Sequence, residues 1–335
     1  MRISCSPGVA EVTQLRKVSI VVVSYNGLHE ATRPCLESVF GKTACPEYEV
    51  IVVDNHSSDG TVDYLKRMAA REPRLKCVFN AVNRGFAGGN NDGIRAASGD
   101  ILVLLNNDTL VTEGWLGKIV SALEEDRSIG LAGPVSNSVG NEQRIHTSGR
   151  TPGEILAEGE VWAAASRGDK FETDRLGFFC IAMRRDVLDA VGMLDESYGY
   201  GFYEDDDYCI RVREAGYRLV CLEDVFVYHR GSATFGKGSP ETKALLRRNR
   251  ALLERKFGVA YLPLHPRDGQ FRLLESYLGR MRTAGADEAL LFKTGNRMKL
   301  LEELRPKGPL KRWRYLRRMK GIASEVSRLR PGRTG

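Results

Sequence analysis

The residues best suited to chemistry follow a short apolar strand at residues 101–105. The segment reads ILVLLNND, so five aliphatic side chains lead directly into Asn106, Asn107 and Asp108. A run of this length is typical of a buried parallel strand and is far too short to cross a membrane. Ligands of open α/β sheets bind beyond the carboxyl ends of such strands. We therefore expect Asp108 to hold a divalent cation against a phosphate group.

A row of four acids at residues 204–207 is a second candidate for chemistry. It follows a segment that contains Tyr198, Tyr200, Phe202 and Tyr203. Adjacent carboxylates repel one another, so burial would raise the pKa of at least one and suit it to act as a general base. The structural alternative is a helix that begins with acids, because carboxylates are favourable at the positive end of the helix dipole.

Asp54 and His229 stand at the ends of two further predicted strands, and each has a functional and a structural interpretation. Asp54 ends the strand YEVIVV, where it could accept hydrogen bonds from a base or ribose, or cap an Asx turn. His229 ends the strand VFVYH. A lone histidine is more often structural, but an imidazole beside a carboxylate is a workable site for a divalent ion. The interpretation of His229 therefore depends on whether folding brings it to Asp108.

A glycine-rich segment, NRGFAGGNN, occupies residues 83–91. We expect a loop at residues 85–89 whose backbone N–H groups approach phosphates, followed by a helix whose N-terminus favours anions. Arg84 would add a positive charge for a diphosphate. The segment does not match GxGxxG and follows the third strand, which opposes a nicotinamide site, and a glycine loop alone is often only a turn.

The elements that must position these residues alternate regularly in the first part of the chain. Apolar runs predict strands at residues 17–24, 48–53, 76–79 and 101–105, with helices at 29–39, 61–71 and up to about 97. This alternation is the signature of an α/β fold with a mostly parallel central sheet flanked by helices.

The pattern is less regular after Asp108. We expect helices at residues 115–125, 187–191, 205–215 and 240–257, strands at 130–135, 218–220 and 225–228, and polar irregular chain at 136–170. The predicted domains are an N-terminal extension at 1–16, an α/β domain at 17–257, and a helical, basic C-terminal extension at 258–335.

Composition limits the class of protein. The 335 residues are 42% hydrophobic and 28% charged, which is typical of a soluble globular protein. The seven cysteines are scattered without CxxC pairs, which favours reduced thiols in the cytoplasm and opposes a zinc site. The N-terminus has no apolar core, so we expect no secretory signal.

The net charge of +7 is concentrated at the C-terminus. Residues 305–335 contain eleven Lys or Arg and one acid, so the other 304 residues carry −3. In KRWRYLRRMK, helical spacing places Trp313, Leu316 and Met319 or Lys320 near one face. This pattern predicts a helix on an anionic membrane surface, at the cytoplasmic face of the inner membrane. The alternatives are a disordered basic tail and a nucleic-acid-binding tail, and the acidic body opposes the latter.

Six segments occur together in one order along residues 17–257. They read VSIVVVSYN, VIVVDNHSSDGT, NRGFAGGN, LLNND, GFYEDDDYCIR and HRGS. Together they resemble the family 2 glycosyltransferases of GT-A fold, especially the rhamnosyltransferase-like branch. Each segment is unspecific alone, whereas six in order are specific for the family but not for the sugar.

The resemblance implies a role for each matching residue. Donor binding falls to Ser24, Tyr25, Asn26, Asp54, Asn83, Arg84, Gly85 and Asn107. Asp108 matches the last acid of the metal-binding DxD-like motif, with His229 as a second ligand, for Mn²⁺ or Mg²⁺. Asp205, in the pair with Glu204, matches the catalytic base. Asn106 replaces the usual first acid of the motif, so we expect weak metal affinity without donor.

The implied activity is inverting transfer of a sugar from a UDP- or dTDP-sugar, rhamnose-like or other, to a glycan or lipid-linked glycan hydroxyl. Trp115 matches a frequent aromatic beyond the metal motif, but a core role is an equally good interpretation. The alternatives are a non-catalytic nucleotide-sugar binder, a nucleic-acid-binding protein that uses the tail, and a retaining or nucleotidyl transferase on a similar sheet.

Overall fold

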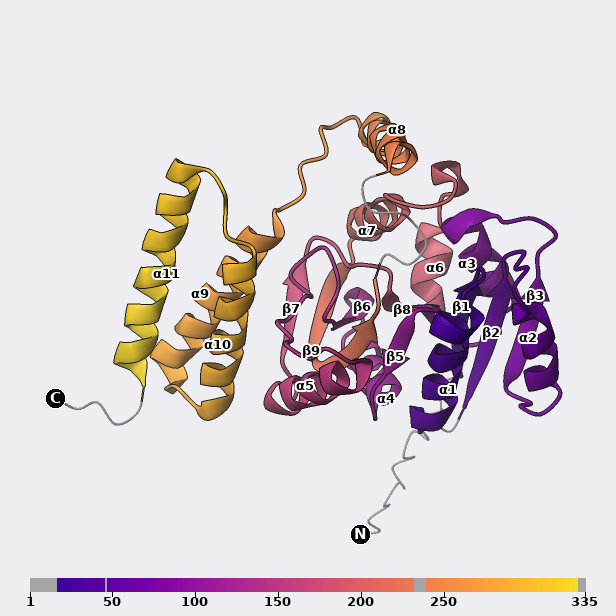
Figure 1. Cartoon of the computed structure of the whole chain (residues 1–335), viewed down its shortest axis with the longest axis horizontal. Coiled ribbons are helices and arrows are strands. Elements are labelled where there is room, and N and C mark those ends of the chain that lie inside the picture. Colours follow the sequence, from indigo (N-terminus) through magenta and orange to yellow (C-terminus); the bar gives the residue numbers. More distant parts are fainter. Residues whose placement is uncertain (1–16, 46, 232–238, 331–335) are drawn as a thin grey trace, which may run out of the picture.

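The structure, a computed structural model, describes residues 17–45, 47–231 and 239–330 (Figure 1). The predicted N-terminal extension, residues 1–16, and Ser232 of the HRGS segment lie outside this range. The first strands are β1 (Val18–Ser24), β2 (Tyr48–Asp54), β3 (Leu75–Phe79) and β4 (Ile101–Asn106). They pair in parallel in the order β3-β2-β1-β4, as the alternating pattern predicted. The carboxyl ends of all four strands therefore meet at one edge.

Helices cover both faces of this sheet because its strands are apolar on both sides. The connecting helices are η1 (Leu28–Thr32), α1 (Arg33–Lys42), α2 (Thr61–Ala69) and α3 (Gly85–Ala96). Ile20 and Val22 of β1 pack in a core with α1, α2 and α4 (Trp115–Glu125), whereas Val21 packs in a second core with α3. Trp115 belongs to the first core and is 1% exposed, which supports its interpretation as a core residue.

The second half of the sheet has mixed strand directions. Its strands are β5 (Thr109–Val111), β6 (Ile129–Val135), β7 (Lys170–Thr173), β8 (Cys180–Arg184) and β9 (Arg218–His229). Strand β8 is antiparallel to β4 and β6, while β9 is parallel to β6 and antiparallel to β5 and β7. The accompanying helices are α5 (Pro152–Ala165), α6 (Arg185–Val191), η2 (Glu196–Tyr198), α7 (Glu204–Glu214) and α8 (Pro240–Phe257). The sheet is thus parallel on one side and mixed on the other.

Three predicted elements were wrong. The predicted glycine loop at 85–89 is the first turn of α3, where Gly89 and Gly93 let the helix pack closely against Val23 and Val21 of β1. The stretch predicted as irregular contains α5, which begins with a capping box between Thr151 and Glu154. The two predicted strands at 218–228 are one continuous strand, β9.

Three helices follow the α/β part and pack around a core of their own. They are α9 (Pro266–Ala284), α10 (Glu288–Glu303) and α11 (Pro309–Leu329). In Figure 1 they stand beside β7 and α5, at the far end of the molecule from α2. Within the described ranges, every helix is too short or too polar to cross a membrane.

A buried ion network joins these helices to the sheet. Glu223 of β9 accepts hydrogen bonds from Lys293 at 2.7 Å and from Arg297 at 2.6 Å, both on α10. Both cations are fully buried, and Lys293 also contacts Asp169 at 2.6 Å. Because a desolvated charge is costly without a partner, loss of any one member of this network would destabilise the contact between the helices and the sheet.

Candidate functional site

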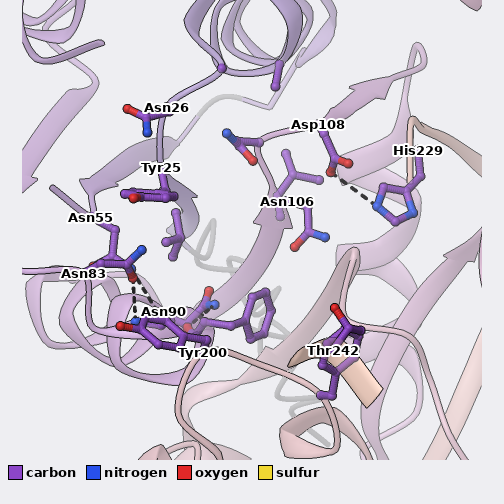
Figure 2. Close-up of a pocket in the computed structure, with 18 of the residues that line it drawn as sticks. Tyr25, Asn26, Asn55, Asn83, Asn90, Asn106, Asp108, Tyr200, His229 and Thr242 are labelled. Atoms are coloured by element: carbon purple, nitrogen blue, oxygen red, sulfur yellow. Dashed lines mark hydrogen bonds and ion pairs between the residues drawn. The ribbon is translucent and has the colours of Figure 1, made fainter. Parts of the chain in front are cut away.

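A cavity of about 950 Å³ lies at the edge where the carboxyl ends of β1, β2 and β4 meet (Figure 2). Its polar wall is made by side chains that directly follow strands, as the sheet topology predicts. The labelled lining residues are Tyr25, Asn26, Asn55, Asn83, Asn90, Asn106, Asp108, Tyr200, His229 and Thr242. The volume is at the upper end of the range for small-molecule and cofactor sites.

Asp108 and His229 lie together at one end of this cavity. The Nε2 atom of His229 is 3.3 Å from Oδ1 of Asp108 (Figure 2). Strand pairing explains the proximity, because Thr109 of β5 pairs with His229 of β9 and the Arg230 N–H donates to the Asp108 carbonyl. The predicted juxtaposition of the two residues is therefore present.

The imidazole is held in the orientation that a metal ligand needs. Its Nδ1 atom is 2.7 Å from the carbonyl oxygen of Ser138. A carbonyl can only accept a hydrogen bond, so we infer that Nδ1 carries a proton. The Nε2 atom faces Asp108: it donates to the carboxylate when the ring is protonated and can accept a cation when the ring is neutral. Phe179 stacks on the ring with centroids 5.2 Å apart. A backbone carbonyl behind a histidine is the usual support of a metal-binding imidazole.

The electrostatics of this pair favour a cation. Burial of His229 opposes its protonation, but the hydrogen bond and charge of Asp108 outweigh this and raise the pKa of His229. In the described ranges no third His, Cys, Asp or Glu converges on the pair. A carboxylate and an imidazole fit a hard divalent ion whose other positions are filled by phosphate oxygens and water, as is usual for Mg²⁺.

The opposite wall of the cavity is formed by amides and an aromatic ring. Asn55 donates to Oδ1 of Asn83 and to the Gly85 carbonyl, both at 3.0 Å, and accepts from the Arg84 N–H at 3.0 Å. Tyr25 is 44% exposed, so one face of its ring is free to contact a ligand. Such a wall suits the stacking and hydrogen bonding of a nucleobase and ribose.

Two residues predicted to bind the donor form hydrogen bonds within the protein and do not line the cavity. Ser24 is buried and its hydroxyl is hydrogen-bonded to that of Thr32 at 2.7 Å. Asp54 accepts from the Ser57 N–H at 3.0 Å, which matches its interpretation as a turn cap. Neither belongs to the described residues that line the cavity. Asn107 does line it, while donating to Thr32 at 3.0 Å.

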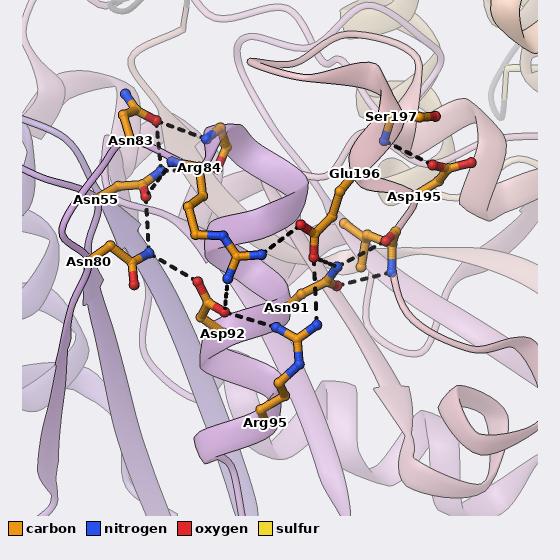
Figure 3. A network of polar contacts seen from close by, with 12 residues as sticks. Asn55, Asn80, Asn83, Arg84, Asn91, Asp92, Arg95, Asp195, Glu196 and Ser197 are labelled. Atoms are coloured by element: carbon orange, nitrogen blue, oxygen red, sulfur yellow. Dashed lines mark hydrogen bonds and ion pairs between the residues drawn. The ribbon is translucent and has the colours of Figure 1, made fainter.

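The side chain of Arg84 points into a network instead of the cavity (Figure 3). Its guanidinium contacts Asp92 at 2.5 Å and Glu196 at 2.7 Å, and Glu196 also accepts from Asn91 at 2.9 Å. Arg95 contacts the same two carboxylates, and Arg84 is not among the described residues that line the cavity, so the structure does not support the expectation that Arg84 supplies positive charge to a diphosphate. Arg84 instead ties α3 to η2.

Gly85 brings the start of α3 against the loop before α7. Its φ is +70°, and a Cβ there would lie 2.2 Å from the Gly199 carbonyl oxygen. The Phe86 N–H donates to the Tyr200 carbonyl at 3.3 Å. Only glycine permits this approach. The loop places Tyr200 and Phe202 on the cavity.

The predicted catalytic acids lie in the first turn of α7, immediately after this loop. Phe202 and Tyr203 both have left-handed φ values, of 73° and 75°. Such backbone strain in residues with large side chains is typical of functional sites. Neither Glu204 nor Asp205 is among the described cavity-lining residues, although the adjoining Phe202 is.

The two acids differ in their surroundings. Glu204 is buried, and its Oε2 atom has no hydrogen-bond partner within the described ranges; burial raises its pKa. Asp205 is half-buried and accepts the Asp206 N–H at 2.9 Å. Burial, and then the charge of Asp206, raise the pKa of Asp205 to about 7. A carboxyl group that titrates near neutral pH suits general acid–base chemistry.

Comparison with known proteins identifies the family. The family model "Glycosyl transferase family 2" matches residues 19–192, just over half of the chain. The chain belongs to glycosyl transferase family 2. This confirms the resemblance drawn from the six sequence segments.

Relatives in this family are distant. The uncharacterized protein y4gI of Sinorhizobium fredii is 27% identical over 261 residues, which are 72% of this chain and 27% of y4gI. Glycosyltransferase AglE of Haloferax volcanii is 28% identical over 216 residues, 63% of this chain and 66% of AglE. The matched region thus spans less than two thirds of each of these relatives.

A solved structure shares the fold. The mannosyltransferase PcManGT of Pyrobaculum calidifontis, in complex with GDP-Man and Mn²⁺, superimposes with a TM-score of 0.52 at 20% identity, covering 94% of this chain and 88% of PcManGT. The fold of this family 2 protein is therefore GT-A, as predicted.

Sequence patterns missed several residues at this family 2 site. Asn55 follows Asp54 and organises the amide wall, but only a contact with Asn83 distinguishes it from any turn asparagine. Thr242 and Leu246 of α8 line the cavity from a helix remote in sequence, for which no local signal exists. Ser138, whose carbonyl orients His229, lies in a stretch predicted only as irregular.

Proposed function

We propose that this protein transfers a sugar from a nucleotide-diphospho-sugar to a hydroxyl of a glycan or lipid-linked glycan, with inversion. The observation that carries the proposal is the Asp108–His229 pair, whose imidazole is oriented by the Ser138 carbonyl at one end of a large cavity. The pair lies on the same cavity as the amide wall around Asn55 and Asn83. That arrangement suits a ligand with a diphosphate at one end and a nucleoside at the other.

Different cavity residues would contact different parts of the donor. Tyr25 and the amides of Asn26, Asn55 and Asn83 would contact the base and ribose. Asp108 and His229 would hold Mn²⁺ or Mg²⁺, which when bound would offset the charge that grows on the departing diphosphate. The complex of PcManGT with GDP-Man and Mn²⁺ supports this combination of donor and metal.

Asp205 is the proposed general base. It would take the proton of the acceptor hydroxyl while that oxygen attacks the anomeric carbon from the side opposite the diphosphate, which inverts the configuration. Its half-buried position and raised pKa suit this role, since a group with a pKa near 7 is partly ionised at neutral pH yet basic enough to accept a proton. Burial raises the pKa of the neighbouring Glu204, which opposes a second negative charge beside Asp205.

Donor binding is the direct test. The full chain would be titrated by calorimetry with UDP-, dTDP- and GDP-sugars, with and without Mn²⁺. We expect one nucleotide class to bind and Mn²⁺ to tighten it at least tenfold, and Asp108→Asn to abolish the gain from Mn²⁺. Asp63→Asn, an equal charge change on exposed α2, is the matched control. Binding of no nucleotide sugar, or an equal gain from Mn²⁺ in Asp108→Asn, would overturn the proposal.

A further inference from the structure

We propose that the exposed face of α11 docks on an anionic lipid surface. This surface lies apart from the donor cavity, so the inference does not depend on sugar transfer. It goes further than the basic composition of residues 305–335, because the structure defines which face of the helix is free and which residues it presents.

One side of α11 is already used for packing. Tyr315, Met319, Ile322 and Val326 are buried in the core shared with α9 and α10. Their spacing of four, three and four residues marks a single helical stripe. Residues 309–329 are therefore an ordered helix held on the bundle, which excludes the disordered alternative for this segment. Met319, predicted to accompany Trp313, faces the opposite way.

The other side of α11 presents large apolar side chains to solvent. Leu310 is 60% exposed, Trp313 57% and Leu316 40%. Helical geometry places Leu310 and Trp313 on the side that faces away from the buried stripe and Leu316 at its flank. A tryptophan flanked by leucines is the composition of a helix that lies in the headgroup region of a bilayer.

Basic side chains surround these apolar ones. On α11, Arg318 is paired with Glu275 and Glu325 with Arg282, whereas Arg317 lies over the ring of Trp313. Five more cations of α11 form no ion pair within the described ranges: Lys311, Arg312, Arg314, Lys320 and Arg328. Trp313, Arg314 and Arg317 also border a hollow of about 790 Å³ between α9 and α11. The surface is thus complementary to negatively charged headgroups.

This combination favours a lipid surface over RNA. Cations alone would serve either partner, because both carry phosphates. Binding to an RNA phosphate backbone would not bury the apolar surface of Leu310 and Leu316, whereas binding to a bilayer would. Residues 1–304 carry a net charge of −3, which opposes a broad electrostatic footprint for RNA. Docking through α11 would make this a peripheral protein at the cytoplasmic face of the membrane.

The tryptophans provide a direct assay of docking on the full chain. Trp115 and Trp162 are 1% and 0% exposed, so a change of fluorescence on binding reports Trp313. Vesicles of phosphatidylcholine with about 30 mol% phosphatidylglycerol would be compared with pure phosphatidylcholine vesicles. We expect co-sedimentation and a blue shift with the anionic vesicles alone, and quenching by lipids brominated in the acyl chain.

Charge reversal on the proposed face has a matched control at the other end of the molecule. Each basic residue near an anionic surface strengthens partitioning about fivefold, so Arg314→Glu with Arg317→Glu should weaken it about 25-fold or more. The pair Arg67→Glu and Arg71→Glu makes the same change of charge on exposed positions at and just beyond α2 and should bind like the wild type. Trp313→Ala should weaken binding without altering the charge.

Three outcomes would overturn the proposal. The first is an equal loss of vesicle binding in both charge-reversal pairs. The second is vesicle binding without any change in Trp313 fluorescence. The third is displacement of the protein from the vesicles by RNA at an equal concentration of negative charge. Substitutions are preferable to deletion of residues 305–335, because deletion would remove Tyr315 and Met319 from the core of the bundle. Donor binding by each variant, measured separately, distinguishes a failure of docking from a failure of the proposed function.

Discussion

Replacing the proposed catalytic base should stabilise the protein while it abolishes activity. Burial and the charge of Asp206 raise the pKa of Asp205 from 3.8 to about 7. Folding therefore favours the protonated acid, and the wild type loses stability as the pH rises from about 4 through about 7. An asparagine at position 205 has no charge to desolvate, so the variant should not show this loss.

The magnitude follows from the same values. At about 1.4 kcal/mol per pKa unit, ionised Asp205 costs the folded state at most ~4 kcal/mol above pH 7. Neighbouring acids share this cost, Asp205 is partly exposed, and its charge interacts favourably with the α7 dipole. We therefore expect Asp205→Asn to raise the free energy of unfolding by about 1–2 kcal/mol at pH 8 and by almost nothing at pH 4. Loss of the base should lower the rate of transfer about 10²- to 10⁴-fold.

Asp207, two residues further along α7, is a control with the opposite expected sign. It is fully buried and accepts from Arg211 and Lys256, both at 2.6 Å, and from Tyr198 at 3.1 Å. Asp207→Asn leaves Arg211 without its carboxylate and Lys256 with Asp195 alone, so we expect it to destabilise the fold by about 2–3 kcal/mol. The sign of the change in the free energy of unfolding on Asp→Asn substitution thus distinguishes an acid proposed to act in catalysis from one that stabilises the fold.

The assay combines two measurements on both variants. Urea unfolding at pH 4 and pH 8 gives the stability difference, and release of nucleoside diphosphate in the presence of acceptor gives the rate. Wild-type transfer should rise with pH through about 7, since the base must be ionised. The reasoning is refuted if Asp205→Asn is less stable than the wild type at pH 8, or if it retains transfer while donor binding is unchanged.

Three further substitutions test the site and its supports. His229→Gln should remove the gain in donor affinity from Mn²⁺, measured by calorimetry, and an unchanged metal titration would contradict the assignment. Glu223→Leu should destabilise the fold by about 3–5 kcal/mol in urea, because Arg297 remains buried without a carboxylate and Lys293 keeps only Asp169; a loss under 1 kcal/mol would show that the network relaxes. Gly85→Ala should cost about 2 kcal/mol or more and weaken donor binding, because its Cβ would collide with the Gly199 carbonyl; wild-type melting and binding would contradict this.

The parallel half of the fold could be predicted from sequence because its signals are local. Strands β1, β2 and β4 are short apolar runs that end at polar residues, and helices of the right length separate the first four strands. Helix α5 was missed because its residues are mostly Gly, Ala and acids without a clear apolar stripe, although the capping box of Thr151 and Glu154 was present in the sequence. Strand β9 was split because Glu223 and Asp224 interrupt its apolar run; Glu223 is held inside by cations that lie about 70 residues away.

The sequence predicted which residues reach the cavity where position along a strand decides their place, and failed where the direction of the side chain decides it. Asp108, Asn107 and Tyr25 reach the cavity because they follow the carboxyl ends of strands. Arg84 also follows a strand, but its direction depends on Glu196, which lies 112 residues further along the chain. No local sequence pattern contains such a contact. From the sequence alone, an arginine that binds a phosphate therefore could not be distinguished from one that forms ion pairs within the protein.

On the proposed assignment, Asp108 and His229 would provide two protein ligands for a metal at a site that lacks the first acid of the DxD motif. In the described structure the two side chains contact each other. A cation would have to replace that contact, so we expect its net affinity for the free protein to be low. A bound diphosphate adds oxygen ligands and negative charge, which makes the exchange favourable. Because linkage is reciprocal, the cation must strengthen donor binding by the same factor, so metal and donor should be bound and released together.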